Sequence, residues 1–439
     1  MRNWNLPVAV IGQDRPGPYQ LYDLFMSLRV LHTSDWHLGH TLHGVERDLE
    51  HASFIEWLLE TLERERVDAV LAAGDVFDAA NPPASATALW YRFLAQAWRR
   101  APGLQVVVVG GNHDSAARLD APDPLLKALG RLTVIGGLPR REREIAFDRL
   151  AVPLADASGQ VAAWVAAIPF LRSPDVAGGG ADDGHVEGAR RVIQGAVEAA
   201  RSRRSPGQAL LAVAHCHLAG GSMSVLSERK LVIGKQEALP ADVFPADLSY
   251  VALGHLHLAQ EVDAPARPRY AGSVLPLSFP ERRYHHQVLL LELEGERVAS
   301  VRPLFVPRTV EVVSLPDEGP RPLEEVLQLL RALPARGDGR DDRRPYLEVH
   351  VTLDRPEPGL RQILDDALRG KEVRLVRIAP PRLNGNGEAL ADSGGTALLD
   401  LLPEDVFRRK YERDYGSAPP DDLLAAFREL HDGIFQERA

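Results

Sequence analysis

The sequence is poor in cysteine, methionine and aromatic residues. It contains one cysteine and three methionines among 439 residues, and aromatic residues make up 6%. A single cysteine excludes an internal disulfide, so nothing favours an oxidising compartment. The chain also lacks a run of roughly 18 apolar residues, the length that a membrane helix needs, and its first residues do not form a signal peptide. These absences predict a cytoplasmic protein without a membrane anchor.

Positive charge is also scarce, since 51 basic residues stand against 61 acidic ones and give a net charge of −10. Surfaces that bind nucleic acid through electrostatics alone are usually basic, so an extended surface of this kind is disfavoured. The charge is compatible with an enzyme that contacts phosphate groups through bound metal ions. A simpler alternative is that the acidic residues only keep the protein in solution.

The length and the 45% hydrophobic content predict two or three globular domains. No regular pattern precedes Met26, and we expect this part to be disordered or to lie before the true translation start. Alternating apolar and amphipathic stretches follow, then a shorter strand–helix–strand–helix–strand pattern, a Pro- and Gly-rich linker and a helical end. The predicted units are residues 1–25, 26–307, 308–378, 379–395 and 396–439.

One pattern recurs five times along the chain: an apolar, strand-like run ends in a cluster of potential metal ligands. The runs are Arg29–Thr33 before Asp35 and His37, Val67–Ala73 before Asp75 and Asp78, Gln105–Val109 before Asn112, His113 and Asp114, Leu210–Ala214 before His215 and His217, and Leu248–Leu253 before His255 and His257. The carboxyl ends of buried strands meet at one edge of a sheet, where loops form ligand sites. An Asp-x-His motif alone is common by chance, and Gly-Asn-His-Asp directly after a valine run is much rarer. All five motifs in one chain, each at the end of a strand, predict one shared site.

The residue types in these clusters indicate the chemistry of the site. Aspartate, asparagine and histidine suit Mn²⁺, Fe or Zn²⁺, and the lack of thiolates disfavours a structural zinc site. The seven candidate ligands are Asp35, His37, Asp75, Asn112, His215, His255 and His257. Seven ligands are too many for one ion. They suit two ions about 3.5–4 Å apart that share a carboxylate, as in enzymes that displace phosphate esters.

The motifs, in this order, resemble those of the calcineurin-like metallophosphoesterase superfamily. The matching stretches are Thr33–Gly39, Ala73–Asp78, Gly111–Ser115 and Ala252–His257. A further stretch, Tyr270–Phe279, contains no metal motif and is similar to the SbcD family of DNA repair nuclease subunits. The resemblance covers about residues 28–307 and continues more weakly to the end of the chain.

The resemblance implies an α/β (α+β) fold, with a four-layer β-sandwich flanked by helices, a small α/β capping domain and a C-terminal helical segment. It also implies roles for the candidate ligands. One metal ion would be held by Asp35, His37, Asp75 and His257, and the second by Asp75, Asn112, His215 and His255, with Asp75 bridging. His113 would act from outside the coordination sphere on a phosphate oxygen, with Asp114 orienting it.

The implied function is that of a DNA exonuclease and endonuclease with two Mn²⁺ ions per chain, although Mg²⁺, Fe or Zn²⁺ would also suit the ligands. The resemblance further implies a homodimer within a heterotetramer, formed with an SbcC-type coiled-coil ATPase that residues 396–439 would bind. The chain has no Walker-type loop of its own. The metal motifs leave a rival open, namely a phosphoesterase of the same fold that acts on small phosphodiesters or phosphoproteins.

Overall fold

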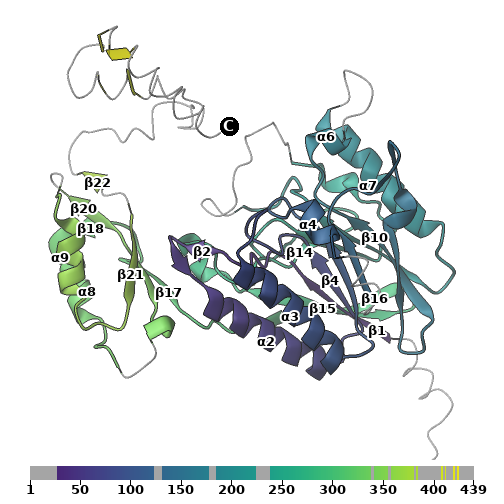
Figure 1. The fold of residues 1–439 in the computed structure, drawn as a ribbon, viewed down its shortest axis with the longest axis horizontal. Coiled ribbons are helices and arrows are strands. Elements are labelled where there is room, and N and C mark those ends of the chain that lie inside the picture. The colour runs from purple at the N-terminus through teal and green to yellow at the C-terminus, as the bar shows by residue number, and fades with distance from the viewer. Residues whose placement is uncertain are drawn as a thin grey trace, which may run out of the picture.

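The fold comes from a computed structural model (Figure 1), which describes most of the chain up to residue 379. The described ranges are 27–122, 131–176, 184–223, 238–337, 341–353, 357–379 and 382–383, with isolated positions after residue 406. The expected extension at residues 1–25 lies outside them. So do most of the expected linker and nearly all of the expected helical segment, and those expectations remain predictions.

The first sheet carries three of the five ligand motifs. Its six strands lie in the order β16 (Arg297–Phe305), β15 (Gln287–Glu294), β1 (Ser27–Thr33), β4 (Ala69–Ala73), β5 (Gln105–Val109) and β6 (Arg131–Ile135). Strands β1, β4, β5 and β6 are parallel, whereas β15 pairs antiparallel with β1 and β16 antiparallel with β15. The parallel strands therefore deliver the residues that follow them to one edge of the sheet.

The second sheet carries the other two motifs. Its six strands lie in the order β13 (Gln260–Glu261), β14 (Arg269–Tyr270), β12 (Tyr250–Gly254), β11 (Ala209–His215), β10 (Val161–Ile168) and β9 (Ala151–Ala155). The strands from β14 to β10 are parallel, and the two at the edges are antiparallel to their neighbours. Strand β11 is buried at every residue, which is consistent with the apolar run that precedes its last residue, His215.

The two sheets pack face to face and are covered by helices on their outer sides. Along β1, Val30 faces the core between the sheets, while Leu31 faces α2 (Asp48–Arg64) and α3 (Ala84–Arg100). Helix α7 (His185–Arg201) covers the second sheet through contacts with β9, β10 and β11. This arrangement of two mixed sheets flanked by helices confirms the expected fold class. No described helix is both long and apolar enough to cross a membrane.

A small α/β part follows the two helix-covered sheets in the chain. It contains β17 (Val312–Leu315), β18 (Arg321–Pro322), α8 (Leu323–Ala332), β19 (Tyr346–Val349), β20 (Val351–Leu353), α9 (Leu360–Ala367), β21 (Arg374–Ile378) and β22 (Arg382–Leu383). Strands β17, β19 and β21 form one parallel sheet, and α8 and α9 pack on each other. The alternating strands and helices expected here are confirmed as elements, and the domain boundaries stay a prediction.

The small α/β part rests on the larger one through a buried contact. Tyr346 packs in an apolar cluster with Phe279 and Leu42, and its hydroxyl donates a hydrogen bond of 2.7 Å to Glu50 Oε2. The Glu50 carboxylate also pairs with the guanidinium of Arg47, whose Nε lies 2.9 Å from Oε2. The buried Glu50 carboxylate thus links the small α/β part to the larger one.

Candidate metal centre

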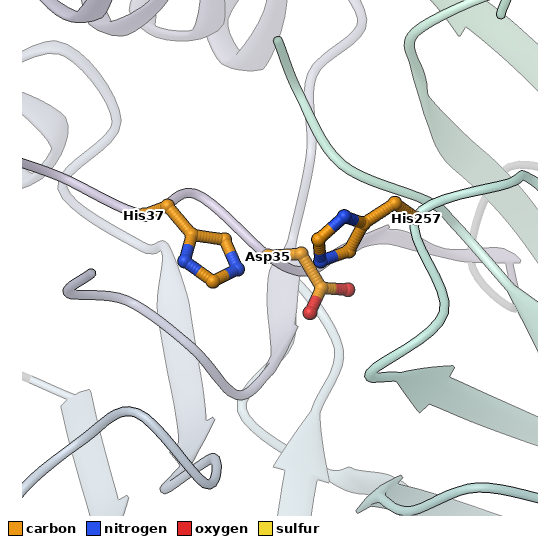
Figure 2. A group of neighbouring side chains, drawn as sticks. All are labelled: Asp35, His37 and His257. Atoms are coloured by element: carbon orange, nitrogen blue, oxygen red, sulfur yellow. The ribbon is translucent and has the colours of Figure 1, made fainter. Parts of the chain in front are cut away.

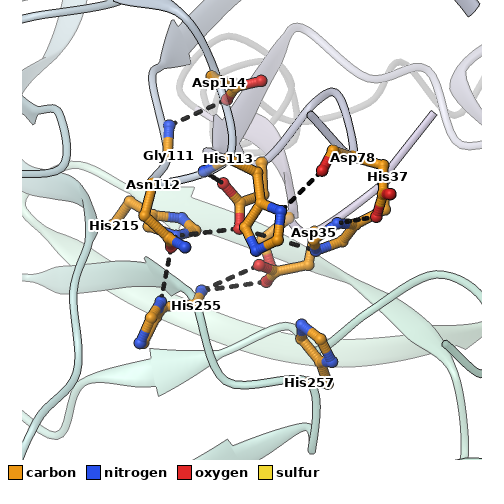
Figure 3. Close-up of polar contacts among 12 residues, drawn as sticks. Asp35, His37, Asp78, Gly111, Asn112, His113, Asp114, His215, His255 and His257 are labelled. Carbon is orange, nitrogen blue, oxygen red and sulfur yellow. Dashed lines mark hydrogen bonds and ion pairs between the residues drawn. The ribbon is translucent and has the colours of Figure 1, made fainter. Parts of the chain in front are cut away.

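The loops after β1, β4, β5, β11 and β12 meet at the edge where the two sheets adjoin. Figure 3 shows predicted metal ligands gathered there, with His113 and Asp114 beside them; those labelled are Asp35, His37, Asn112, His215, His255 and His257. Several contacts join the two sheets directly at this point. The ring of His215 hydrogen-bonds the carbonyl of Ala73 at 2.8 Å, and the backbone N–H of His255 donates to both carboxylate oxygens of Asp35 at 3.1 Å.

The backbone at this edge adopts conformations that side chains rarely take. Asp35, His37 and Asp75 have φ values of 52°, 46° and 50°, and His255 has 107°. Such left-handed conformations cost free energy and persist where the surrounding structure enforces them, commonly at functional sites. Space is equally tight, because a Cβ at Gly111 would lie 2.1 Å from Asp75 Oδ1. A glycine is therefore required there for the close approach of the two loops.

One group of candidate ligands consists of Asp35, His37 and His257 (Figure 2). One donor atom from each lies within 4.8 Å of the others, and all three residues are buried. The Nδ1 atom of His37 meets Asp78 Oδ1 at 3.1 Å, whereas its buried Nε2 has no hydrogen-bond partner among the described residues. Buried polar atoms are rarely left unsatisfied. A cation between these side chains would satisfy this atom.

The second group consists of Asp75, Asn112, His215 and His255. His215 donates its Nδ1 proton to the Ala73 carbonyl, so in the neutral ring Nε2 carries a lone pair. That Nε2 lies 2.8 Å from Asn112 Oδ1 and 3.4 Å from Asp75 Oδ2, both of them acceptors. Acceptors that face one another need a proton or a cation between them, so the donor set fits a metal ion.

Electrostatics at the second group favour a positive charge. Burial lowers the pKa of the His215 ring, but the negative charge of Asp75 outweighs this and raises it to about 9. Burial raises the pKa of Asp75, and its histidine neighbours His215 and His37 more than offset this effect, so that it lies below its usual range. Burial and the charge on His215 hold the pKa of His255 well below its ordinary value. A proton on His215 thus stands where the cation would bind.

Because this proton competes with the metal ion, we expect metal binding to depend on pH. Because the pKa of His215 is raised to about 9, the metal-free site carries the proton below that pH and must release it when a cation binds. We expect the apparent affinity for Mn²⁺ to rise by up to about tenfold per pH unit between about pH 7 and 8.5. Calorimetric titrations in buffers of different ionisation enthalpy measure both the affinity and the released proton. An affinity that is independent of pH over this range would contradict the assignment.

His113 and Asp114 follow the same strand but have different partners. The backbone N–H of His113 donates to Asp75 Oδ1 at 2.8 Å, and its ring Nδ1 donates to the carbonyl of Asp78 at 2.7 Å. Burial lowers the pKa of His113, which leaves a neutral ring with its Nε2 lone pair available. The carboxylate of Asp114 instead accepts backbone N–H groups from three residues of the adjoining loops, Val76, Phe77 and Gly111.

The expected role of Asp114 in orienting His113 stays a prediction. Asp114 shapes the backbone of the two loops, while the hydrogen bond that orients the His113 ring comes from Asp78. The sequence prediction left two carboxylates out of the site. Potential donor atoms of Asp78, His37 and His113 lie within 4.8 Å of one another. The carboxylate of Glu281 lies 3.0 Å from His257 Nδ1. Asp78 belongs to a motif and had a signal in the sequence, whereas Glu281 had none.

Fold and site together define a metallophosphoesterase. A family model described as calcineurin-like phosphoesterase matches residues 28–259, and one described as type 5 capsule protein repressor C-terminal domain matches residues 307–415. The SbcD component of the SbcCD nuclease from Rhodobacter capsulatus is 43% identical over 361 residues, which cover 81% of this chain and 88% of the relative. The chain belongs to the SbcD family of nuclease subunits within the calcineurin-like phosphoesterases.

Two further relatives extend the match over nearly the whole chain. The corresponding SbcCD nuclease component of Escherichia coli is 30% identical over 397 residues, covering 87% of this chain and 92% of the relative. That of Bacillus subtilis is 30% identical over 416 residues, covering 94% of this chain and 100% of the relative. The predicted resemblance to the SbcD family is confirmed.

Proposed function

We propose that this chain hydrolyses phosphodiester bonds of DNA with two Mn²⁺ ions held at the meeting edge of its two sheets. The observation that carries the proposal is the convergence of acceptor atoms from both sheets on the Asp75 carboxylate. One ion would be held by Asp35, His37, Asp75 and His257, and the other by Asp75, Asn112, His215 and His255. When bound, two divalent cations activate water and neutralise charge on the phosphate oxygens.

The chain's own groups complete the chemistry around the ions. The Ala73 carbonyl accepts the Nδ1 proton of His215, so that Nε2 of this ring faces the site. The Asp78 carbonyl accepts the Nδ1 proton of His113 and orients the Nε2 of that ring in the same way. From that position His113 can exchange a proton with a phosphate oxygen, which is the part of a general acid–base group. Asp114 holds the loops of Asp75 and His113 in register through backbone N–H groups, so the reacting groups need no rearrangement.

Three observations favour DNA as the substrate. The relatives are named as nucleases, the chain matches them over most of its length, and a small α/β part is anchored to the larger one through Tyr346, in the same apolar cluster as Phe279. We propose that this part caps the site and shapes access for a long substrate. The rival function, a phosphoesterase for small phosphodiesters or phosphoproteins, uses the same metal centre and differs only in what reaches it.

Degradation of end-labelled linear duplex DNA tests the substrate assignment. The purified chain is expected to cut the duplex in Mn²⁺, more slowly in Mg²⁺, and not at all in EDTA. A small chromogenic phosphodiester serves as the comparison substrate. Hydrolysis of the small ester without cutting of DNA, also after an SbcC-type ATPase is added, would contradict the proposal and support the rival.

The name SbcCD given to the relatives indicates a complex with a second component. We propose an SbcC-type coiled-coil ATPase as the partner of this chain, with residues 396–439 as the binding segment and two copies of each protein in the complex. Deleting residues 396–439 is expected to abolish co-purification with that ATPase while DNA cutting in Mn²⁺ persists. Retained binding of the truncated chain would contradict the assignment of this segment.

A further inference from the structure

Glu281 is a buried carboxylate that belongs to neither ligand group. It lies in the short 3-10 helix η3 (Phe279–Arg283), and its side chain has no exposed surface. An ionised carboxylate is costly to bury unless it is paired and hydrogen-bonded. Its two oxygens have distinct partners: Oε2 accepts the backbone N–H of Leu277 at 2.7 Å, and Oε1 lies 3.0 Å from Nδ1 of His257.

The contact with His257 has a chemical consequence for the metal centre. A carboxylate oxygen accepts hydrogen bonds, so the Nδ1 atom of His257 carries the proton and Nε2 carries the lone pair. Carboxylates that accept the second ring N–H of a ligating histidine fix its tautomer and raise its basicity. Glu281 therefore accepts the Nδ1 proton of His257, just as the Ala73 carbonyl accepts the Nδ1 proton of His215. In both cases the hydrogen bond turns the remaining nitrogen toward the site.

The surroundings of η3 keep this carboxylate in place. Phe279, the first residue of η3, is fully buried in the apolar cluster that joins the two parts of the chain and packs with Tyr346 there. On the other side, the backbone N–H of Tyr284 closes the turn on the carbonyl of Glu281 at 2.9 Å. Side chains that support a site act with precision only when packing locks their own position. The packing of the small α/β part against Phe279 thus contributes to the position of Glu281.

We propose that Glu281 is a positioning residue for the ion held by Asp35, His37 and His257, and that it acts through the tautomer and orientation of His257. The proposal rests on the proposed function, because it takes His257 to be a ligand. The proposal predicts different effects on the two ions. Glu281 contacts a ligand of the first group, whereas His215 of the second group is held by the backbone carbonyl of Ala73. A purely structural role would instead weaken the fold and both ions together.

The test measures Mn²⁺ binding to the metal-free full chain by calorimetry, which resolves two sites without relying on activity. Glu281→Ala is expected to weaken one of the two ions by about 10–100-fold and to leave the other unchanged. Glu281→Gln keeps the size and an acceptor oxygen, so its loss is expected to be smaller, and it carries the test if the alanine variant does not fold. Arg283→Ala is the matched control, because this residue of η3 pairs outward with Asp317.

A double-mutant cycle with His257→Ala completes the design. If Glu281 acts through His257, the loss caused by Glu281→Ala disappears in the His257→Ala background. Additive losses, equal weakening of both ions, or unchanged binding in Glu281→Ala would each overturn the proposal. If His257→Ala itself leaves both ions unaffected, the ligand set of the proposed function is wrong, and this outcome is distinct from a failure of Glu281 alone.

Discussion

Asp75→Ala is expected to abolish the nuclease activity, with a loss on the order of 10⁴-fold or more, down to the level seen in EDTA. Asp75 contacts histidines of both groups, since its Oδ2 lies 3.7 Å from His37 Nε2 and 3.4 Å from His215 Nε2. Its Oδ1 also accepts the backbone N–H of His113. Removing it takes away a ligand of both ions and the anchor of the His113 loop at once.

The measurement compares turnover on labelled duplex DNA and the Mn²⁺ content of the variant with those of the unchanged chain. Asp68→Ala is a useful control, because this carboxylate lies at the opposite, amino-terminal end of β4 and accepts the backbone N–H of Arg29. Its replacement is expected to leave the Mn²⁺ content unchanged. An Asp75→Ala chain that keeps two ions and substantial turnover would show that Asp75 does not bridge them.

His113→Ala is expected to depress turnover by roughly 10²–10⁴-fold while both metal ions stay bound, as is typical of a general acid–base group. The ring lies beside His37, with centroids 4.8 Å apart, and is aimed by the Asp78 carbonyl, yet it belongs to neither four-residue ligand group. The loss corresponds to about 3–5 kcal/mol of transition-state stabilisation. It should appear in kcat rather than in metal affinity.

Single-turnover cleavage at saturating Mn²⁺ separates these effects. Replacement of the exposed His285 with alanine provides a matched control and is expected to leave turnover unchanged. His113→Gln keeps a polar side chain near the phosphate and is expected to lie between alanine and the unchanged chain. Turnover of His113→Ala that equals that of the His285 control would remove His113 from the mechanism.

The ligand positions could be predicted from the sequence because each motif follows a buried strand. The apolar run Gln105–Val109 matches β5 residue for residue, and the polar residues after it lie at the expected edge. Helix boundaries are predicted less well. The four-residue spacing of Phe54, Leu58 and Leu62 predicts a helix over Glu50–Arg66, whereas helix α2 begins at Asp48 and ends at Arg64. Asp48 and Glu50 both lie in the first turn, where acidic residues interact favourably with the helix dipole.

Contacts between distant segments could not be predicted from the sequence. Glu281 stands in a Phe-Pro-Glu-Arg-Arg stretch that has the composition of a solvated turn, yet the burial of Phe279 and the hydrogen bond from the Leu277 N–H hold its carboxylate beside His257. Asp78 has a motif, but its backbone carbonyl rather than its side chain orients the ring of His113. The pairing of β1 with β15 likewise joins strands from the two ends of the larger part, which are far apart in the sequence, and no local pattern predicts it.

Anomalous diffraction from crystals of the full chain soaked in Mn²⁺ tests the two-ion centre most directly. We expect two strong peaks about 3.5–4 Å apart on either side of the Asp75 carboxylate. One would lie among Asp35, His37 and His257, and the other among Asn112, His215 and His255. A single peak, or two peaks that do not share Asp75, would contradict a two-ion centre built from both sheets.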